Sequence, residues 1–195
     1  MRAARVIIAT LCALTICACT PLPEKTADGR SEEHDIASAT TAPSLPPRPR
    51  EVRLDGLDPC AVLPEEQRLL LSLDHPPNPY VESGFGNAKA CTMRSGISGN
   101  VARLALVTAE GVGVWLDENA QVDARPTTVG GFPGLIVRTP GMDQVCNVEV
   151  DVAEGQFLDV MFRDGGNETK ATQETLCLGA QRVAEAAIAA LLQRG

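Results

Sequence analysis

The side chains that could perform nucleophilic chemistry are few and far apart in this sequence. Its two histidines are His34 and His75, and Ser98 lies in a GISG segment, which does not match the GxSxG pattern of serine hydrolases. A serine nucleophile needs a base and an orienting group beside it, whereas His75 precedes two prolines in a predicted loop. We therefore interpret His75 as a solvent-exposed loop residue, and we predict no catalytic residue and no enzymatic activity.

Three acidic residues of the C-terminal half could form a carboxylate site. Glu149, Asp151 and Asp159 are predicted on the outward faces of two neighbouring strands, where paired carboxylates could support glycoside hydrolysis. No aromatic platform for a sugar accompanies them, so we expect a solvent-exposed sheet face. The segment 117–128 partly resembles a calcium-binding loop, but it lacks glycine at its sixth position and glutamate at its twelfth. We therefore predict no metal site and no cofactor.

The composition excludes a further class of function. The 195 residues carry a formal net charge of −8, and aromatic residues make up 3% of the chain. Nucleic-acid binding requires a basic face for the phosphates, and the binding of single strands also uses aromatic rings for base stacking. We therefore predict that nucleic acid is not a partner.

The N-terminus has the organisation of an export signal. Arg2 and Arg5 precede an apolar run of about a dozen residues, which is too short to cross ~30 Å of hydrocarbon comfortably but fits the core of a signal peptide. The segment ICAC, residues 16–19, resembles the bacterial lipobox, whose cysteine receives a diacylglyceryl group before cleavage. We predict a signal peptide over residues 1–18, lipidation of Cys19 and attachment to the extracytoplasmic face of the cell membrane. An uncleaved membrane helix and an ordinary secretory signal are the alternatives.

Lipidation changes what the seven cysteines indicate. Cys12 and Cys17 leave with the signal peptide and Cys19 carries the lipid, so four cysteines remain. An even number in an exported domain indicates two disulfide bonds. A four-cysteine zinc site is the weaker alternative, because no two of the four form a CxxC pair. The predicted disulfide cysteines are Cys60, Cys91, Cys146 and Cys177.

A change in composition separates two further segments. Residues 19–52, which begin at the lipidated cysteine, are rich in proline, serine, threonine, alanine and charge, and we predict that they form a disordered tether. Residues 53–195 are predicted to form one extracytoplasmic domain, which contains 11 basic and 19 acidic residues. We therefore expect the lipid alone, and not a basic patch, to hold the domain at the membrane.

The N-terminal part of this domain is predicted to be helical and then irregular. Helices are expected to start at Asp58-Pro59 and at Pro64, because aspartate caps a helix and proline suits the first turn. Residues 74–86 contain three prolines and are expected to form a loop. The second helix is expected to bury one apolar face, formed by Leu69, Leu70, Leu71 and Leu73.

The remainder of the domain is predicted to be a sheet followed by a helix. A first strand is expected to begin around Cys91. Alternating apolar residues predict further strands over residues 101–108, 112–116, 135–138, 145–152 and 157–163, with a polar stretch over residues 117–127. A final helix is expected from Thr172 to about Leu192. The predicted fold is α+β: a twisted antiparallel sheet with one face exposed to water and an N-terminal and a C-terminal helix packed on the other.

These elements favour one of the three possible disulfide connectivities. Cys146 is predicted on the inward face of its strand and Cys177 near the start of the final helix, so a bond between them would attach the helix to the sheet. The complement is Cys60–Cys91, which joins the first helix to the first strand. Each bond closes a loop of about 31 residues, which stabilises the fold by up to about 3.7 kcal/mol in the chain-entropy model.

Several short segments occur in an order that resembles a known family. They are LDPCAVL at residues 57–63, ACTM at 90–93, VGGFPG at 129–134 and CNVEV at 146–150. With the lipobox and the tether, they resemble the actinobacterial lipoproteins grouped as domain of unknown function 3558. Met93 departs from that family, in which tryptophan often follows the second cysteine. The resemblance implies an anchored extracytoplasmic domain without a known activity.

The sequence favours a binding or sensing role for this domain. Tyr80 and Phe85 are two of only six aromatic residues, and they lie in the proline- and glycine-rich segment 74–86. Aromatic residues exposed in such a loop would form a contact site for an envelope ligand or protein, whereas buried ones would only fill the edge of the core. A hydrolase that uses His75 or the clustered carboxylates, and a structural accessory subunit of an envelope complex, are the alternative functions.

Overall fold

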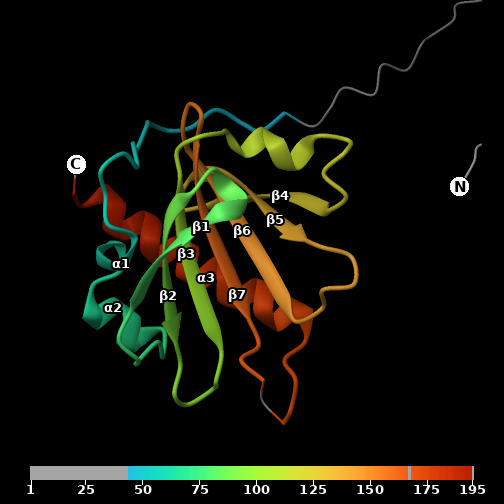
Figure 1. Ribbon diagram of the computed structural model, residues 1–195. Helices are drawn as coiled ribbons and strands as arrows, with labels where there is room; N and C mark the ends of the chain where they lie inside the picture. Colours follow the sequence, from blue (N-terminus) through green and yellow to red (C-terminus); the bar gives the residue numbers. More distant parts are fainter. Residues whose placement is uncertain (1–43, 167, 195) are drawn as a thin grey trace, which may run out of the picture. The chain divides into compact units, whose positions relative to one another are not determined.

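The computed structural model describes residues 44–166 and 168–194, which belong to one compact unit (Figure 1). The predicted signal peptide, the lipidation site Cys19 and the predicted tether up to residue 43 lie outside the described residues. The disordered tether and the lipid anchor therefore stay predictions from the sequence.

The domain is built on a seven-stranded sheet in the order β1-β2-β3-β7-β6-β5-β4, in which every neighbouring pair is antiparallel. Alternation of apolar residues locates the central strands correctly, and the predicted antiparallel sheet is confirmed. The strands are β1 (Asn78–Glu82), β2 (Ala88–Arg94), β3 (Val101–Val107), β4 (Asp123–Val129), β5 (Phe132–Arg138), β6 (Val145–Ala153) and β7 (Gln156–Arg163).

The long helix α3 (Gln173–Leu192) covers one face of the sheet, which we call the first face. The hydroxyl of its N-cap Thr172 accepts a hydrogen bond from the amide of Thr175, as the sequence predicts. α3 is long and apolar enough to cross a membrane by length and composition alone, but its apolar side packs against β6 and β7. Its buried residues are Leu176, Cys177, Ala180, Val183, Ala184, Ala187, Ile188, Ala190 and Leu191.

The N-terminal helices are short. In α1 (Pro59–Val62), the side chain of Asp58 accepts a hydrogen bond from the amide of Cys60, and α2 (Glu65–Leu70) follows directly. The predicted apolar face of α2 is wrong, because Leu69 is 54% and Leu70 is 74% exposed. The helix stops after Leu70 and the chain turns through Ser72, which has a positive φ of 59°. The turn sends Leu73, not the leucines of the helix, into the core.

Three further elements differ from the expected ones. The predicted loop 74–86 contains the edge strand β1 and the 3-10 helix η1 (Ser83–Phe85). An edge strand tolerates Pro79, because the side without an N–H can face away from the sheet. Residues 112–116 form the 3-10 helix η2 (Val112–Leu116) instead of a strand. The polar stretch after η2 supplies β4, the opposite edge, which pairs only with β5 among the described strands.

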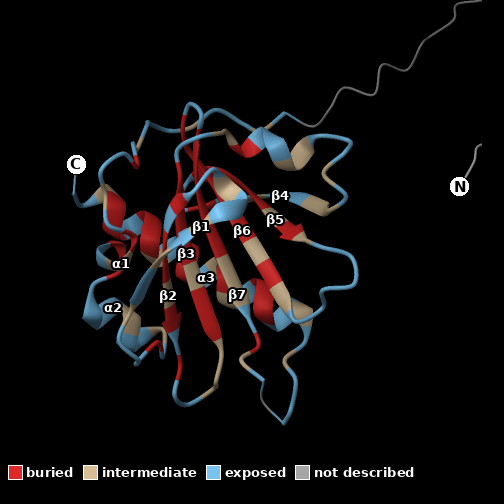
Figure 2. Cartoon of the chain, in the orientation of Figure 1, coloured by how far each residue is buried: buried red, intermediate tan, exposed pale blue. Residues whose placement is uncertain are grey.

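The prediction that the second face of the sheet is exposed to water is also wrong. η1, η2 and residue Leu45 pack over it, and Figure 2 shows the central strands coloured as buried along most of their length. Alternation alone cannot separate a solvated face from one covered by short irregular segments. The apolar residues buried on the second face are Ala88, Ala90, Ala105, Val107, Val112, Leu135, Val137 and Phe157.

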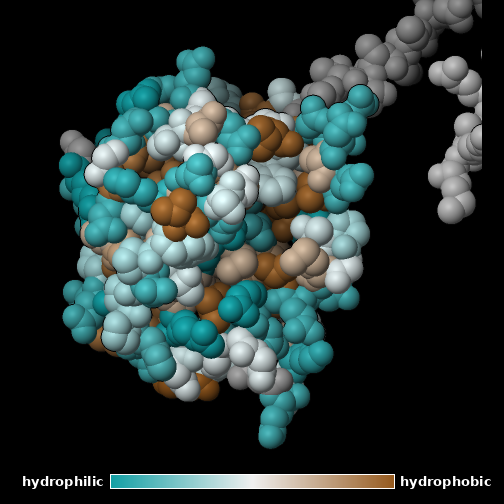
Figure 3. Space-filling view, in the orientation of Figure 1, coloured by the Kyte–Doolittle hydropathy of each residue, from teal (hydrophilic) through white to brown (hydrophobic). Residues whose placement is uncertain are grey.

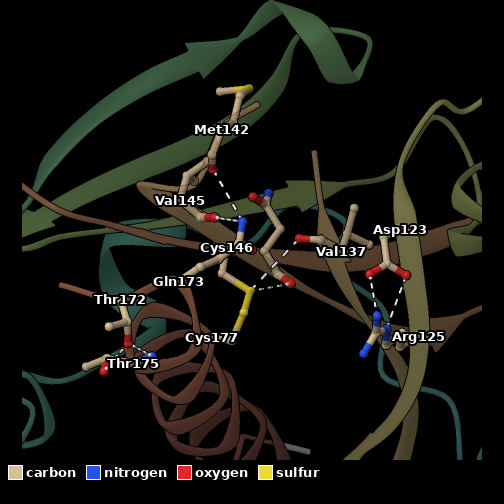
Figure 4. The surroundings of a disulfide bond; sticks show 11 residues. Asp123, Arg125, Val137, Met142, Val145, Cys146, Thr172, Gln173, Thr175 and Cys177 are labelled. Carbon is tan, nitrogen blue, oxygen red and sulfur yellow. Dashed lines mark hydrogen bonds and ion pairs between the residues drawn. A yellow bond between two sulfur atoms is a disulfide. The ribbon is translucent and has the colours of Figure 1, made fainter. Parts of the chain in front are cut away.

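Both predicted disulfide bonds are confirmed. Cys60–Cys91 joins α1 to β2 with a Cα–Cα distance of 5.1 Å, and Cys146–Cys177 joins β6 to α3 with a Cα–Cα distance of 5.0 Å. In Figure 4 the start of α3 is also fixed by Gln173, whose amide nitrogen donates to the carbonyls of Met142 and Val145 at 3.4 and 3.3 Å. Each bond of this loop length stabilises the folded state by about 2–4 kcal/mol.

The described part of the predicted tether lies against the domain. One nitrogen of Arg48 donates to both oxygens of Asp151 at 2.8 Å, and the amide of Val52 donates to the carbonyl of Val152 at 2.8 Å. Residues 45–52 are therefore held to the same unit as the segment that follows the predicted boundary at residue 53.

Candidate functional site

The register of the sheet gathers charged side chains on the second face. Asp159 on β7 lies directly between Ala105 on β3 and Glu149 on β6, and Arg103 lies two residues before Ala105. Asp159 and Glu149 are both fully buried. We call the group of residues Glu82, Arg103, Asn147, Glu149 and Asp159 the buried polar network.

Arg103 is the cation of this network. Its Nε and Nη2 atoms lie 2.9 and 2.6 Å from Oδ2 of Asp159, and its Nη1 donates to Oε2 of Glu82 at 2.9 Å. Alanines occupy the adjacent positions of the second face on β2 and β3, which leaves room for the long side chain to reach β1. The guanidinium therefore ties a central strand to an edge strand and is only 13% exposed.

Asp159 uses both of its oxygens. Oδ2 accepts hydrogen bonds from Arg103, and Oδ1 accepts one from the side-chain amide of Asn147 at 2.7 Å. Burial raises the pKa of Asp159, while Arg103 and Asn147 act in the opposite direction because they stabilise the carboxylate. Burial lowers the pKa of Arg103, but the charges of Asp159, Tyr80 and Glu82 together outweigh burial, so the pKa is raised overall.

In the described part of the chain, the carboxyl group of Glu149 lacks hydrogen bonds of this kind. Neither of its carboxyl oxygens has a hydrogen-bond partner among the described residues, although the side chain is fully buried. Burial raises its pKa well above the ordinary value of 4.5, and the neighbouring negative charge of Asp159 raises it further. Glu149 therefore keeps its proton at pH values where an exposed glutamate has lost it. Arg103 then faces two carboxylates, Asp159 and Glu82.

Aromatic side chains border the network. The phenol oxygen of Tyr80 lies 3.2 Å from Oε2 of Glu82, and the ring of Phe85 lies 5.7 Å from the guanidinium carbon of Arg103. Phe85 also makes edge contacts with Trp115 at 6.0 Å and with Phe157 at 5.6 Å between ring centroids. Tyr80 and Phe85 are both half-buried, so each contacts the network on one side and solvent on the other.

The surface over this region is uneven. Figure 3 shows apolar side chains gathered in several places among polar ones on this side of the molecule. Beside η2 a pocket of about 530 Å³ is lined by Trp115 and Leu116 and by the acidic residues Asp117, Glu118 and Asp123. The indole Nε1 of Trp115 is buried without an acceptor among the described residues.

The structure separates the other candidate residues. Asp151 pairs with Arg48, away from the Glu149–Asp159 pair, so only two of the three predicted carboxylates come together. His75 is exposed, and within residues 44–166 and 168–194 no hydrogen bond joins its ring to a carboxylate.

In the calcium-like segment Asp117 accepts hydrogen bonds from Asn119, while Asp123 pairs with Arg125. The described residues contain no cluster suited to a metal ion.

The residues missed from the sequence are Arg103, Asn147 and Glu82. One signal could have found the first of them: Arg103 is the only charged residue in the apolar run of β3, VARLALV. A charge in such a strand must either reach solvent or find a buried partner. Asn147 and Glu82 carry no comparable signal, since each depends on the register of distant strands.

We predict that Glu149→Gln changes the pH dependence of stability. Because the pKa of Glu149 is raised in the folded state, the folded protein binds more protons than the unfolded chain between pH 4.5 and the folded pKa, and stability falls as the pH rises through this range. The variant cannot lose a proton there. Relative to the wild type, its free energy of unfolding should rise from pH 5 to pH 9.

Chemical denaturation at both pH values measures this difference. Glu118→Gln, which makes the same change at an exposed position, serves as the control and should follow the wild type. Parallel pH profiles for the wild type and Glu149→Gln would contradict the assignment of a raised pKa to Glu149.

Comparison with known proteins supplies a family. No curated protein and no solved structure matches the chain. A family model described as "Protein of unknown function (DUF3558)" matches residues 14–190, which include the whole sheet, both disulfide bonds and nearly all of α3. The chain therefore belongs to the DUF3558 family of proteins of unknown function.

Proposed function

We propose that this protein is a cell-envelope lipoprotein whose extracytoplasmic domain binds a ligand or a protein partner without catalysing a reaction. The attachment part of the proposal is supported by the lipobox-like segment that ends at Cys19 and by the two disulfide bonds, which are typical of exported domains. In this proposal the acyl chains on Cys19 hold the protein on the extracytoplasmic face of the membrane.

One observation carries the binding part of the proposal. Tyr80 and Phe85 are half-buried over the buried polar network. Tyr80 contacts Glu82 and Phe85 contacts Arg103, so the network holds both rings in place while each keeps an exposed side. Side chains fixed in this way lose little conformational entropy when a partner contacts them. Aromatic residues with a buried side and an exposed side are common at binding surfaces.

A binding role also fits the position of the acidic groups. Glu149 and Asp159, the two carboxyls with the strongest burial, have no exposed surface in this conformation. A substrate could contact them only after the covering segments had moved, whereas a ligand could contact Tyr80 and Phe85 directly. The domain is therefore better suited to recognition than to acid–base catalysis by this pair.

We predict that Cys19 carries the lipid. When the full chain is produced in a bacterium supplied with an alkyne analogue of palmitate, the wild type should be labelled and Cys19→Ala should lose the label. Cys12→Ala and Cys17→Ala remove neighbouring thiols of the same segment and should keep it. Labelling of Cys19→Ala at the level of the wild type would contradict the anchor.

We predict that a photoreactive phenylalanine analogue at position 80 crosslinks to an envelope component. The control places the same analogue at position 81, because Tyr80 and Val81 are neighbours on β1 whose side chains point to opposite faces of the sheet. Mass spectrometry of irradiated envelopes should find an adduct at position 80 that Phe85→Ala reduces. Equal yields at both positions, or no adduct at position 80, would contradict a binding surface there.

A further inference from the structure

Arginines gather where the N-terminal segment of the domain passes the end of α3. Arg50 and Arg53 lie on this segment, Arg194 follows α3, and Figure 1 shows the segment running above the C-terminal end of the helix. The three side chains border one pocket of about 340 Å³. Its other lining residues are Glu51, Val52, Leu57 and Leu191, and we call it the arginine pocket.

Contacts with the surrounding chain position each guanidinium. Arg50 donates to the carbonyl of Leu192 at 3.0 Å, Arg194 donates to the carbonyl of Ala61, and Nε of Arg53 donates to Asp55 at 2.9 Å. A guanidinium has five N–H donors. Each of the three arginines therefore keeps donors for a further acceptor while one of its bonds holds it at the rim of the pocket.

The positive charge of this pocket is only partly neutralised. Asp55 pairs with Arg53, and Glu51 is bound to Arg48 at 3.4 Å. Within the described part of the chain, Arg50 and Arg194 make no ion pair with a carboxylate. The pocket is thus a local excess of positive charge in a domain whose acidic residues outnumber its basic ones.

The wall of the pocket is apolar. Val52 and Leu57 are half-buried and Leu191 is 3% exposed, so aliphatic groups lie next to the arginines. Arginine is the side chain best suited to phosphate, because its planar fork can donate two parallel hydrogen bonds. An aliphatic wall beside such donors matches a phosphate that is esterified to an apolar group.

We propose that the arginine pocket binds the phosphate group of an anionic amphiphile, with the guanidinium groups on the phosphate and Val52, Leu57 and Leu191 against the adjoining carbon chain. The inference rests on the proposed function for the source of the ligand, which is the membrane itself. A lipid on Cys19 would keep Ser44 within about 90 Å of a phospholipid surface, even if the intervening chain were fully extended. It also revises the expectation that the lipid alone, and not a basic patch, holds the domain at the membrane.

The test uses the purified full chain in non-ionic detergent micelles. Inorganic phosphate and dihexanoyl phosphatidylglycerol are titrated separately, and the arginine Nε–Hε signals are followed by NMR. Dihexanoyl phosphatidylcholine, which enters micelles but carries no net charge, is the control probe. The signals of Arg50, Arg53 and Arg194 should shift and saturate with phosphatidylglycerol, at a Kd at least ten-fold below that for phosphate.

A pair of double variants tests the role of the arginines. Arg50→Gln with Arg194→Gln should weaken phosphatidylglycerol binding at least ten-fold. Arg125→Gln with Arg182→Gln removes the same charge from exposed positions elsewhere and should change it less than two-fold. Arg53→Gln loses only an exposed ion pair with Asp55 and should weaken phosphatidylglycerol binding by itself. This single variant keeps the test valid if the first double variant does not fold.

Three results would overturn the proposal: no saturable shift with either anionic probe, equal affinity for the two, or equal losses in the two double variants. None of these measurements depends on acylation. A lack of label at Cys19 would therefore contradict the lipid anchor without changing the binding result, and a lack of binding would leave the anchor intact.

Discussion

The second face of the sheet depends on the ion pair between Arg103 and Asp159. Asp159 is fully buried, and both of its oxygens need donors that only Arg103 and Asn147 supply among the described residues. Removing one partner of a buried pair leaves an uncompensated charge, which costs roughly 3–5 kcal/mol. The same guanidinium also holds Glu82 and therefore the edge strand β1. A single cation thus connects the centre of the sheet to its edge.

This arrangement explains why the aromatic residues lie where they do. Phe85 packs over the guanidinium of Arg103 and against Trp115 and Phe157, and Tyr80 reaches the carboxylate that Arg103 binds. The proposed binding surface is therefore positioned by charge as well as by packing. The first face is held differently, because α3 is joined to the sheet by apolar contacts and by the Cys146–Cys177 bond.

The sequence was sufficient for the parts of the fold that follow a regular period. The alternation in β6 and β7, the apolar stripe of α3 and both disulfide pairs could be predicted, since a strand or helix places its residues on faces in a fixed way. The cover of the second face could not, because η1 and η2 are short and have no such period. Alternation consequently predicts Glu149 and Asp159 in water, because tertiary contacts alone decide their environment. Only Arg103, a lone charge in the apolar strand β3, carries a signal in the sequence.

Arg103 forms its ion pairs with Asp159 and Glu82, and Glu149 is therefore buried as a neutral acid. Carbon-13 NMR of the side-chain carboxyl of Glu149, recorded as a function of pH in the full chain, measures this directly. The account predicts a titration midpoint for Glu149 well above the ordinary pKa of 4.5. A midpoint at or below that value would show an ionised Glu149 on the second face and would contradict the account.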